Sequence, residues 1–259
     1  MRSSKTLKKI RAGKSARMCV LGHYVPAYVT MAARCGYDCI WLDLEHRLID
    51  DREVQALLAY SHLADIDILI RTPTTDKTKL YRYLEDGAAG LMVPHVSTPE
   101  KARAMVEASK FPPIGDRGMD GVGLDADFNL EQDQDEYGRH ANSETFLVVQ
   151  IETPQAVEHV EEIAAIEGVD CLFFGPGDFG FRVRNTETDL TIDSAWERVL
   201  AAGKKNGKFV GRPAPTLETL KTFTDQGAQF LAHGSEFAAL KSMLESCSAE
   251  YDEVLGEEG

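Results

Sequence analysis

The feature that most constrains the fold of this chain is a regular alternation of short apolar runs with longer amphipathic segments. Eight runs have the length and residue types of β-strands: residues 18–22, 39–43, 67–71, 90–94, 146–152, 171–175, 209–212 and 230–234. Most of them are continuously apolar, which is typical of parallel strands covered on both faces. The pattern therefore indicates a parallel sheet whose strands are joined by helices.

The segments between the strands carry helix start and stop signals. Asp50 and Glu53 fit a capping box, and a threonine followed by proline opens a helical pattern at both Thr98 and Thr153. The helix after Thr153 is predicted to end at Gly168, because glycine suits the position just past a helix end.

Eight strands that alternate with helices predict a (β/α)8 TIM barrel, with residues 1–259 as a single domain. An open doubly wound sheet is the alternative, but no GxGxxG motif follows the first predicted strand. Residues 111–145 interrupt the alternation as a long polar connection between the fourth and fifth strands. In a compact domain, a connection this long is usually a lid or a binding loop.

Part of this connection fits the calcium-binding EF-hand template, through Asp133, Asp135, Gly138 and Glu144. Tyr137, however, stands where the template needs a side-chain oxygen ligand, and the flanking segments are poor helices. The segment is therefore better interpreted as a solvated acidic helix and turn.

Charge and cysteine usage limit the class of partner and the compartment. A formal net charge of -14 argues against nucleic acid or an anionic membrane as the main partner. No apolar run approaches the roughly 18 residues that a membrane-spanning helix needs. The five cysteines show no metal-finger spacing and the basic first segment lacks the apolar core of a signal peptide. These features favour a cytoplasmic protein with reduced thiols.

Ionisable residues gather where two neighbouring strands end. Asp43, Glu45 and His46 close the second apolar run, and Arg71 closes the third. In a TIM barrel the active site lies at the carboxyl ends of the strands, so these side chains are expected to share one mouth. Arg71 offers a planar fork for a carboxylate or an enolate, or it is an ordinary surface arginine. His46 is either a general base or a neutral histidine with a structural role.

Two carboxylates occupy corresponding places later in the chain. Glu152 directly follows an apolar run, and Asp178 lies in the Gly-Pro-Gly-Asp turn after the next run, about one strand–helix unit away. Adjacent strands would bring the two side chains together. Paired carboxylates that leave positions open for water and substrate are typical of a Mg²⁺ or Mn²⁺ site.

Six segments give the chain a resemblance to a known family: "WLDLEH", "IRTP", "DGAAGLMVP", "FPPIGDRG", "VVQIETPQAVEHVEEIAAIEGVDCLFFGPGD" and "GAQFLAHGSE". In order and spacing they resemble the class II, metal-dependent pyruvate aldolases of the 4-hydroxy-2-oxoheptanedioate and 2-dehydro-3-deoxyglucarate aldolase type, in the aldolase/citrate lyase superfamily. The similarity covers nearly the whole chain.

The resemblance implies a lyase that cleaves or forms 4-hydroxy-2-oxo acids, with pyruvate and an aldehyde as the small-molecule products. It implies a divalent cofactor, Mg²⁺, Mn²⁺ or Co²⁺, held by Glu152 and Asp178. It also implies that Arg71 contacts pyruvate and stabilises its enolate, and that His46 is the acid/base centre.

Further residues receive roles from the same resemblance. Asp43 and Glu45 are placed behind the metal ligands, where they organise water and protons. Gly177 and Arg117 are expected to bind substrate.

The partner of His46 is expected at Glu85, where the family usually has an aspartate, with Asp86 as the rival. Since the second and fourth strands are not neighbours, the partner must reach across the mouth or come from another subunit. The family forms homo-oligomers, typically hexamers or trimers of dimers, so the C-terminal helix, residues 234–255, is expected to be exchanged between subunits.

Several positions depart from the family pattern. "LDADFN" replaces an arginine-rich stretch after the "GDRG" loop, and Phe179 and Gly180 replace the usual leucine-serine. Unusual polar residues follow or end other strands, which suggests an altered aldehyde pocket: His23, His95, Arg212 and His233. Two alternatives stay open. One is a malyl- or citramalyl-CoA lyase, although no phosphate-cradling segment is evident; the other is a non-catalytic relative that binds metal and pyruvate.

Overall fold

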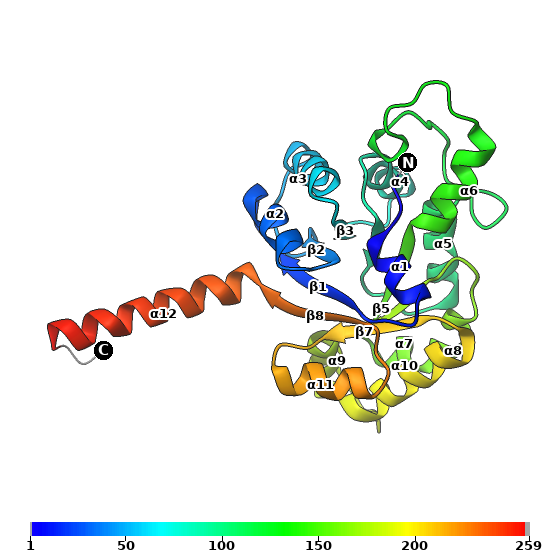
Figure 1. Cartoon of the computed structure of the whole chain (residues 1–259). Coiled ribbons are helices and arrows are strands. Elements are labelled where there is room, and N and C mark those ends of the chain that lie inside the picture. The colour runs from blue at the N-terminus through cyan, green and yellow to red at the C-terminus, as the bar shows by residue number, and fades with distance from the viewer. Residues whose placement is uncertain (1, 257–259) are drawn as a thin grey trace.

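The computed structural model, which describes residues 2–256, is a closed barrel of eight parallel strands surrounded by helices (Figure 1). Each strand pairs with the next in the chain, and the last pairs with the first. The strands are β1 (Ala16–Leu21), β2 (Cys39–Asp43), β3 (Asp67–Arg71), β4 (Gly90–Val93), β5 (Phe146–Ile151), β6 (Cys171–Phe174), β7 (Phe209–Pro213) and β8 (Phe230–Ser235). The predicted TIM barrel is confirmed, and the open-sheet alternative is wrong because β8 closes onto β1.

The helices alternate with the strands and cover the outside of the barrel (Figure 1). They are α1 (Lys5–Arg11), α2 (Pro26–Arg34), α3 (Asp51–Ala64), α4 (Lys77–Glu85), α5 (Pro99–Ser109), α6 (Gln134–Glu144), α7 (Pro154–Glu158), α8 (Val160–Ala164), α9 (Pro176–Val183), α10 (Ile192–Asn206), α11 (Leu217–Asp225) and α12 (Glu236–Leu255). Two helices are exceptions: α1 packs Leu7 against the interior side chains at one end of the barrel, and α12 projects away from the barrel as a single long arm (Figure 1).

Three helix starts follow the predicted capping chemistry. The Asp50 carboxylate accepts the Glu53 amide at 2.9 Å, and the Glu53 carboxylate accepts the Asp50 amide at 3.0 Å, which completes the capping box of α3. Thr98 and Thr153 cap α5 and α7, and each is followed by proline at the first helical position. These side chains satisfy amides that the helix itself leaves without partners.

The predicted helix end at Gly168 is wrong. The helix that starts after Thr153 breaks at His159 into two short pieces, α7 and α8, and the second piece ends at Ala164. Gly168 lies in the following turn with φ 90°, a left-handed conformation that glycine adopts without strain. The sequence therefore located the turn but not the last helical residue.

The barrel interior is filled by large aromatic side chains. Phe146, Phe209 and Phe230 pack edge to face, with ring centroids 5.7–6.2 Å apart. Gly211 lets Phe230 and Phe173 pack closely, because a Cβ at that position would lie 2.1 Å from the Phe230 carbonyl oxygen and 2.8 Å from the ring of Phe173. A second, larger apolar layer lies between the strands and the helices. The interior is therefore a packed core whose polar positions occur only near its ends.

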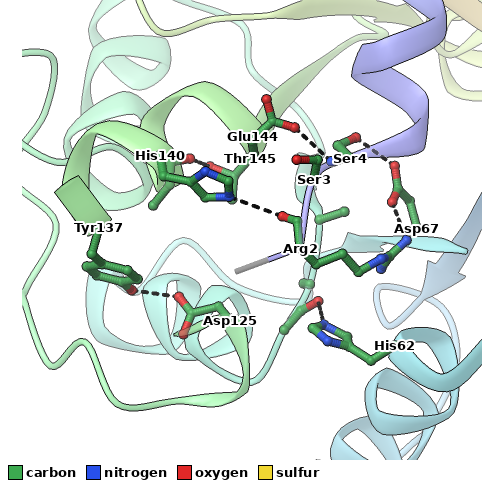
Figure 2. Close-up of a pocket in the computed structure, with 14 residues that line it drawn as sticks. Arg2, Ser3, Ser4, His62, Asp67, Asp125, Tyr137, His140, Glu144 and Thr145 are labelled. Atoms are coloured by element: carbon green, nitrogen blue, oxygen red, sulfur yellow. Dashed lines mark hydrogen bonds and ion pairs between the residues drawn. The ribbon is translucent and has the colours of Figure 1, made fainter. Parts of the chain in front are cut away.

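The N-terminal segment covers the end of the barrel opposite the strand carboxyl ends, where β3 starts at Asp67 and Leu7 packs with the interior side chains. Figure 2 shows how Arg2 and Ser4 of this segment lie against Asp67. The fully buried Asp67 accepts hydrogen bonds from Arg2 Nη2 at 2.7 Å, Ser4 Oγ at 2.6 Å and the Thr6 amide at 2.8 Å. The Ser4 amide in turn donates to Glu144 of α6 at 2.8 Å. A cavity of only about 40 Å³ remains between these groups.

The long connection at residues 110–145 belongs to this closed end. It starts where α5 ends and returns through α6, whose His140 and Glu144 contact the N-terminal segment (Figure 2). The acidic part of the connection forms α6, with Asp133 as its N-cap, as the interpretation of a solvated helix predicted. Because α5 carries the chain to the opposite end of the barrel, the connection lies away from the mouth of its own chain, and its role as a lid or a binding loop stays a prediction.

His62, beside this cavity, makes the stability of the fold dependent on pH. Its ring is half-buried and lies 3.2 Å from the Gly87 carbonyl (Figure 2). Burial lowers the pKa of His62 below the ordinary value of 6.5. As the pH falls below about 6.5, the unfolded chain takes up the proton before the folded chain does, so the fold loses stability.

We expect His62→Gln, which keeps a donor for the Gly87 carbonyl, to flatten this dependence. Thermal unfolding midpoints measured from about pH 7.5 down to pH 5 should fall less steeply in the variant than in the parent protein. Parallel curves for the two proteins would show that His62 has the same pKa in the folded and unfolded states.

Two negative findings complete the fold. Among residues 2–256, no helix is both long enough and apolar enough to cross a membrane. All five cysteines are free thiols, and three of them, Cys19, Cys39 and Cys171, are buried in the strands.

Candidate active site

The carboxyl ends of β2 and β3 place an acidic residue beside an arginine. Asp43 and Arg71 are direct partners in the parallel register. Arg71 donates to both carboxylate oxygens of Asp43, through Nε at 2.9 Å and Nη2 at 2.6 Å. Its Nη1 lies 3.0 Å from Glu45 Oε2, and its guanidinium stacks 4.8 Å from the centroid of Trp41. Arg71 is therefore held on three sides and is not a free surface arginine.

Asp43 organises the turn that follows β2. Its Oδ1 accepts the amides of Glu45 at 3.1 Å and His46 at 3.3 Å. Burial alone would raise the pKa of Asp43, but the hydrogen bonds and charge of Arg71 outweigh it, so the pKa lies below its usual value. Asp43 is therefore ionised at neutral pH and fixes both Arg71 and the turn.

Strand alternation brings Glu152 into the same mouth. Successive inward positions of β5 carry Phe146, Val148 and Gln150, and Glu152 follows in the same series. Glu152 accepts the His95 amide at 2.6 Å and Gln150 Nε2 at 3.1 Å. Burial raises its pKa, the nearby Glu45 and Asp178 carboxylates add to the shift, and His95 opposes it. A buried carboxylate with acidic neighbours is stabilised by a cation.

Three side chains form a cluster that fits such a cation. His95, Glu152 and Asp178 each offer one ligand atom, and these atoms all lie within 4.8 Å of one another. His95 Nδ1 is inaccessible to water and lies 3.0 Å from Glu152 Oε1, yet it forms no hydrogen bond. Two carboxylates and an imidazole suit a divalent metal, so the donor set fits the cofactor that the sequence predicts.

Gly175, at the end of β6, is required for the position of Glu152. A Cβ at Gly175 would lie 2.6 Å from Glu152 Oε2 and 2.8 Å from its Cβ. We expect Gly175→Ala to push the Glu152 carboxylate out of the cluster and to weaken Mn²⁺ or Co²⁺ binding by about 10-fold or more, measured by calorimetry. Gly177→Ala in the same turn is the matched control, because a Cβ there meets nothing within 4 Å. Equal affinities in the two variants would contradict this steric role.

A mouth cavity of about 440 Å³ connects Arg71 to Glu152 and Asp178 of the cluster. It is lined by Trp41, His46, Arg71, Gln150, Glu152, Phe173, Gly175, Pro176, Gly177, Asp178 and Pro213. His46 is 55% exposed there, and its Nε2 lies 3.6 Å from Glu45 Oε2. The structure thus brings together five of the predicted site residues around one space: His46, Arg71, Glu152, Gly177 and Asp178.

Comparison with known sequences decides the family. A profile of the HpcH/HpaI aldolase/citrate lyase family matches residues 17–242. The chain belongs to this family. It is 31% identical to a hydroxypyruvate/pyruvate aldolase of Deinococcus radiodurans, over 98% of this chain and 92% of that protein. It is 34% identical to a 4-hydroxy-2-oxovalerate aldolase of Novosphingobium aromaticivorans, over 81% of this chain and 79% of that protein.

The fold agrees with solved structures of the same family. The HpcH/HpaI aldolase from Desulfitobacterium hafniense matches with a TM-score of 0.88 at 30% identity, over 95% of this chain and 96% of that chain. The resemblance seen in the sequence motifs is confirmed. The protein is a carbon–carbon lyase of the aldolase type.

Two predicted site residues lie far from the mouth of this aldolase chain. Glu85 is the last residue of α4, at the closed end of the barrel, and the neighbouring Asp86 accepts a hydrogen bond from Gln55. Arg117 is buried in the long connection, where it pairs with Asp125 at 3.0 Å and stacks on Phe111. None of these residues reaches His46 or the cluster within one chain, so a partner that reaches across the mouth is ruled out.

The four unusual polar residues do not share one rim. His95 is in the cluster, and His23 lies near the end of β1, 2.9 Å from Glu236. Arg212 instead points outward from β7 into a cage of Phe174, Trp196 and Phe223, where burial lowers its pKa to about 10. His233 bonds the Ala214 carbonyl. The expectation of four residues around one altered pocket is therefore wrong for Arg212.

His95 is the residue of the aldolase cluster whose role sequence reasoning missed. It follows the Val-Pro end of β4, and β4 lies between β3 and β5, which carry Arg71 and Glu152. A histidine at the end of the strand between those two residues was the available signal.

Proposed function

We propose that this aldolase interconverts 4-hydroxy-2-oxo acids with pyruvate and an aldehyde, and that it uses a divalent cation held by Glu152 and Asp178. The observation that carries the proposal is the placement of Arg71, Glu152 and Asp178 around one cavity of about 440 Å³, with His95 clustered against the two carboxylates. The names of the two relatives support a pyruvate-forming reaction. A bound divalent cation would polarise the 2-oxo group and stabilise negative charge in the enolate.

Arg71 orients the oxo acid opposite the cluster. Three of its N–H groups are used by Asp43 and Glu45, which leaves two N–H groups for a substrate oxygen. Because its neighbours fix the guanidinium before substrate arrives, little reorganisation is needed as charge develops on the enolate. The Trp41 ring behind Arg71 keeps water from its rear face.

His46 carries the proton transfer in this proposal. As a neutral ring it removes the 4-hydroxyl proton during cleavage, and as a cation it returns a proton to C3 of the pyruvate enolate. Within one chain, Glu45 Oε2 lies 3.6 Å from the His46 ring, while Asp43 accepts the His46 backbone amide. We propose that Glu85 or Asp86 of a second copy of the chain completes the pair, and that Arg117 of that copy also approaches the substrate.

The projecting helix α12 supports assembly into a homo-oligomer. Phe237, Leu240, Met243 and Leu244 are all more than half exposed along it. An apolar stripe of this kind is normally covered in the functional protein. We propose that α12 packs against another subunit, and that the assembly works in the cytoplasm, where the five free thiols stay reduced. Light scattering should report an oligomer, which truncation after residue 236 should dissociate.

Pyruvate release from a panel of 4-hydroxy-2-oxo acids tests the proposed function directly. A chelator should abolish turnover, and Co²⁺, Mn²⁺ or Mg²⁺ should restore it. Borohydride added with pyruvate should leave no covalent adduct, because this reaction needs no Schiff base. A trapped lysine adduct would contradict the metal mechanism, and tight pyruvate binding without turnover would instead support a non-catalytic relative.

A further inference from the structure

We propose that His95 is a third protein ligand of the cation, through Nδ1, and that Glu45 holds its ring in the ligating orientation. The consequence is a preference for Co²⁺ or Zn²⁺ over Mg²⁺. This inference rests on the metal site of the proposed function and adds to it a nitrogen donor that determines metal choice.

The first support is the state of His95 Nδ1. The atom is buried, lacks a hydrogen bond and lies 3.0 Å from Glu152 Oε1, inside a set of ligand atoms no more than 4.8 Å apart. A buried polar atom without a partner is costly, and such atoms in native structures usually have a role. A cation shared with Glu152 and Asp178 would give the Nδ1 lone pair its missing partner.

The contact of Glu45 with the opposite side of the His95 ring gives a second support. His95 Nε2 lies 3.3 Å from Glu45 Oε1, and Glu45 Oε2 lies 3.0 Å from Arg71 Nη1. Metal-binding histidines usually donate their other N–H to a carboxylate, which fixes the tautomer and makes the ring a better donor. A hydrogen bond from Nε2–H to Glu45 would leave the lone pair on Nδ1, which faces the cluster. Glu45 therefore links the metal side of the mouth to Arg71.

The backbone of His95 gives a third, independent support. Its φ is 53°, a left-handed conformation that is uncommon for residues with a side chain. In this conformation the His95 amide donates to Glu152 Oε1 at 2.6 Å, while the Lys101 ammonium holds the His95 carbonyl at 2.8 Å. Uncommon backbone conformations of this kind cluster at functional sites. One residue thus orients the carboxylate with its amide and presents its ring to the same cluster.

Donor chemistry then sets the preferred ion. Imidazole nitrogen suits Co²⁺ and Zn²⁺, whereas Mg²⁺ favours oxygen ligands and keeps several waters. A site built only from Glu152 and Asp178 would favour hard cations, and the addition of His95 shifts the balance toward nitrogen-binding ions.

Proton NMR of the full-length, Co²⁺-loaded protein tests the ligand assignment. We expect one strongly shifted imidazole N–H signal, from His95 Nε2–H, that disappears in D₂O. His95→Asn tolerates the left-handed backbone and should remove the signal. His23→Asn is the matched control, because His23 also pairs with a carboxylate near the mouth, and it should keep the signal. The assignment is overturned if the signal is absent from the parent protein, survives in His95→Asn or is lost in His23→Asn.

Calorimetric titrations with Co²⁺ and Mg²⁺ test the preference. Glu45→Gln should weaken Co²⁺ binding by about 10- to 100-fold, the usual effect of losing the group that orients a ligand. His95→Asn should weaken it at least as much while changing Mg²⁺ affinity less. An unchanged ratio of the two affinities in His95→Asn would overturn the preference. If the parent protein binds neither ion, both the proposed function and the role of His95 fail. If the parent protein binds metal and releases pyruvate, but His95→Asn leaves the ratio of the Co²⁺ and Mg²⁺ affinities unchanged, only the role of His95 fails.

Discussion

Glu152→Gln is expected to lower Co²⁺ or Mn²⁺ affinity by more than about 100-fold and to abolish pyruvate release, while the barrel stays folded. Glutamine has the same shape and can still accept the His95 amide, so packing and one hydrogen bond survive. The substitution removes the negative charge of the Glu152 carboxylate, and because this position is buried, no water molecule can take the place of that ligand. Calorimetry, metal analysis and circular dichroism on the same sample separate metal loss from unfolding.

Two further variants place this effect at the cluster. Asp178→Asn should act in the same direction, because it also exchanges a cluster carboxylate for an amide. Glu162→Gln on α8 removes an exposed carboxylate that pairs with His159, and it should bind metal like the parent protein. Stoichiometric metal at parental affinity in Glu152→Gln would move the site elsewhere.

The strands could be predicted closely because each lies in an apolar layer on both sides. Every residue of β2 is buried, and every residue of β3 is buried except Arg71. A continuous apolar run is therefore required, and its ends are sharp. Helix ends depend on smaller energies, and a helix break such as that at His159 leaves little trace in the sequence.

The mouth could be predicted in part because strand order follows chain order in this barrel. Neighbouring strand ends then meet by topology alone, as Asp43 and Arg71 do. The same rule fails for Glu85 and Arg117. Glu85 is the last residue of α4 and Arg117 follows α5, and each of these helices returns the chain to the closed end of the barrel. Sequence distance from a strand therefore does not place them at the mouth.

His95 shows a different limit of sequence reasoning. Its position next to a strand end was visible, but its role depends on a left-handed backbone and on Glu45 at 3.3 Å. Neither feature follows from residue types. The expectation that Arg212 lies at the rim failed for a related reason. Strand alternation turns its side chain outward, because the neighbouring Gly211 faces inward.

The second large effect is expected at Arg71. Arg71→Lys keeps the positive charge but loses the planar fork that bonds Asp43 twice and Glu45 once. A single ammonium cannot satisfy both carboxylates and still direct hydrogen bonds at the substrate. We expect kcat to fall by roughly 100-fold or more, the scale seen when one preorganised oxyanion donor is removed.

The kinetic pattern distinguishes this role from a structural one. Because the enolate develops charge only along the reaction, kcat should fall more than KM rises, and Co²⁺ affinity should change far less than in Glu152→Gln. Arg198→Lys is the matched control, since Arg198 also makes a two-point ion pair, with both Glu161 oxygens at 2.8 Å, on the exposed outer surface. A near-parental kcat in Arg71→Lys, equal to that of the Arg198 variant, would show that Arg71 only supports the turn at Asp43.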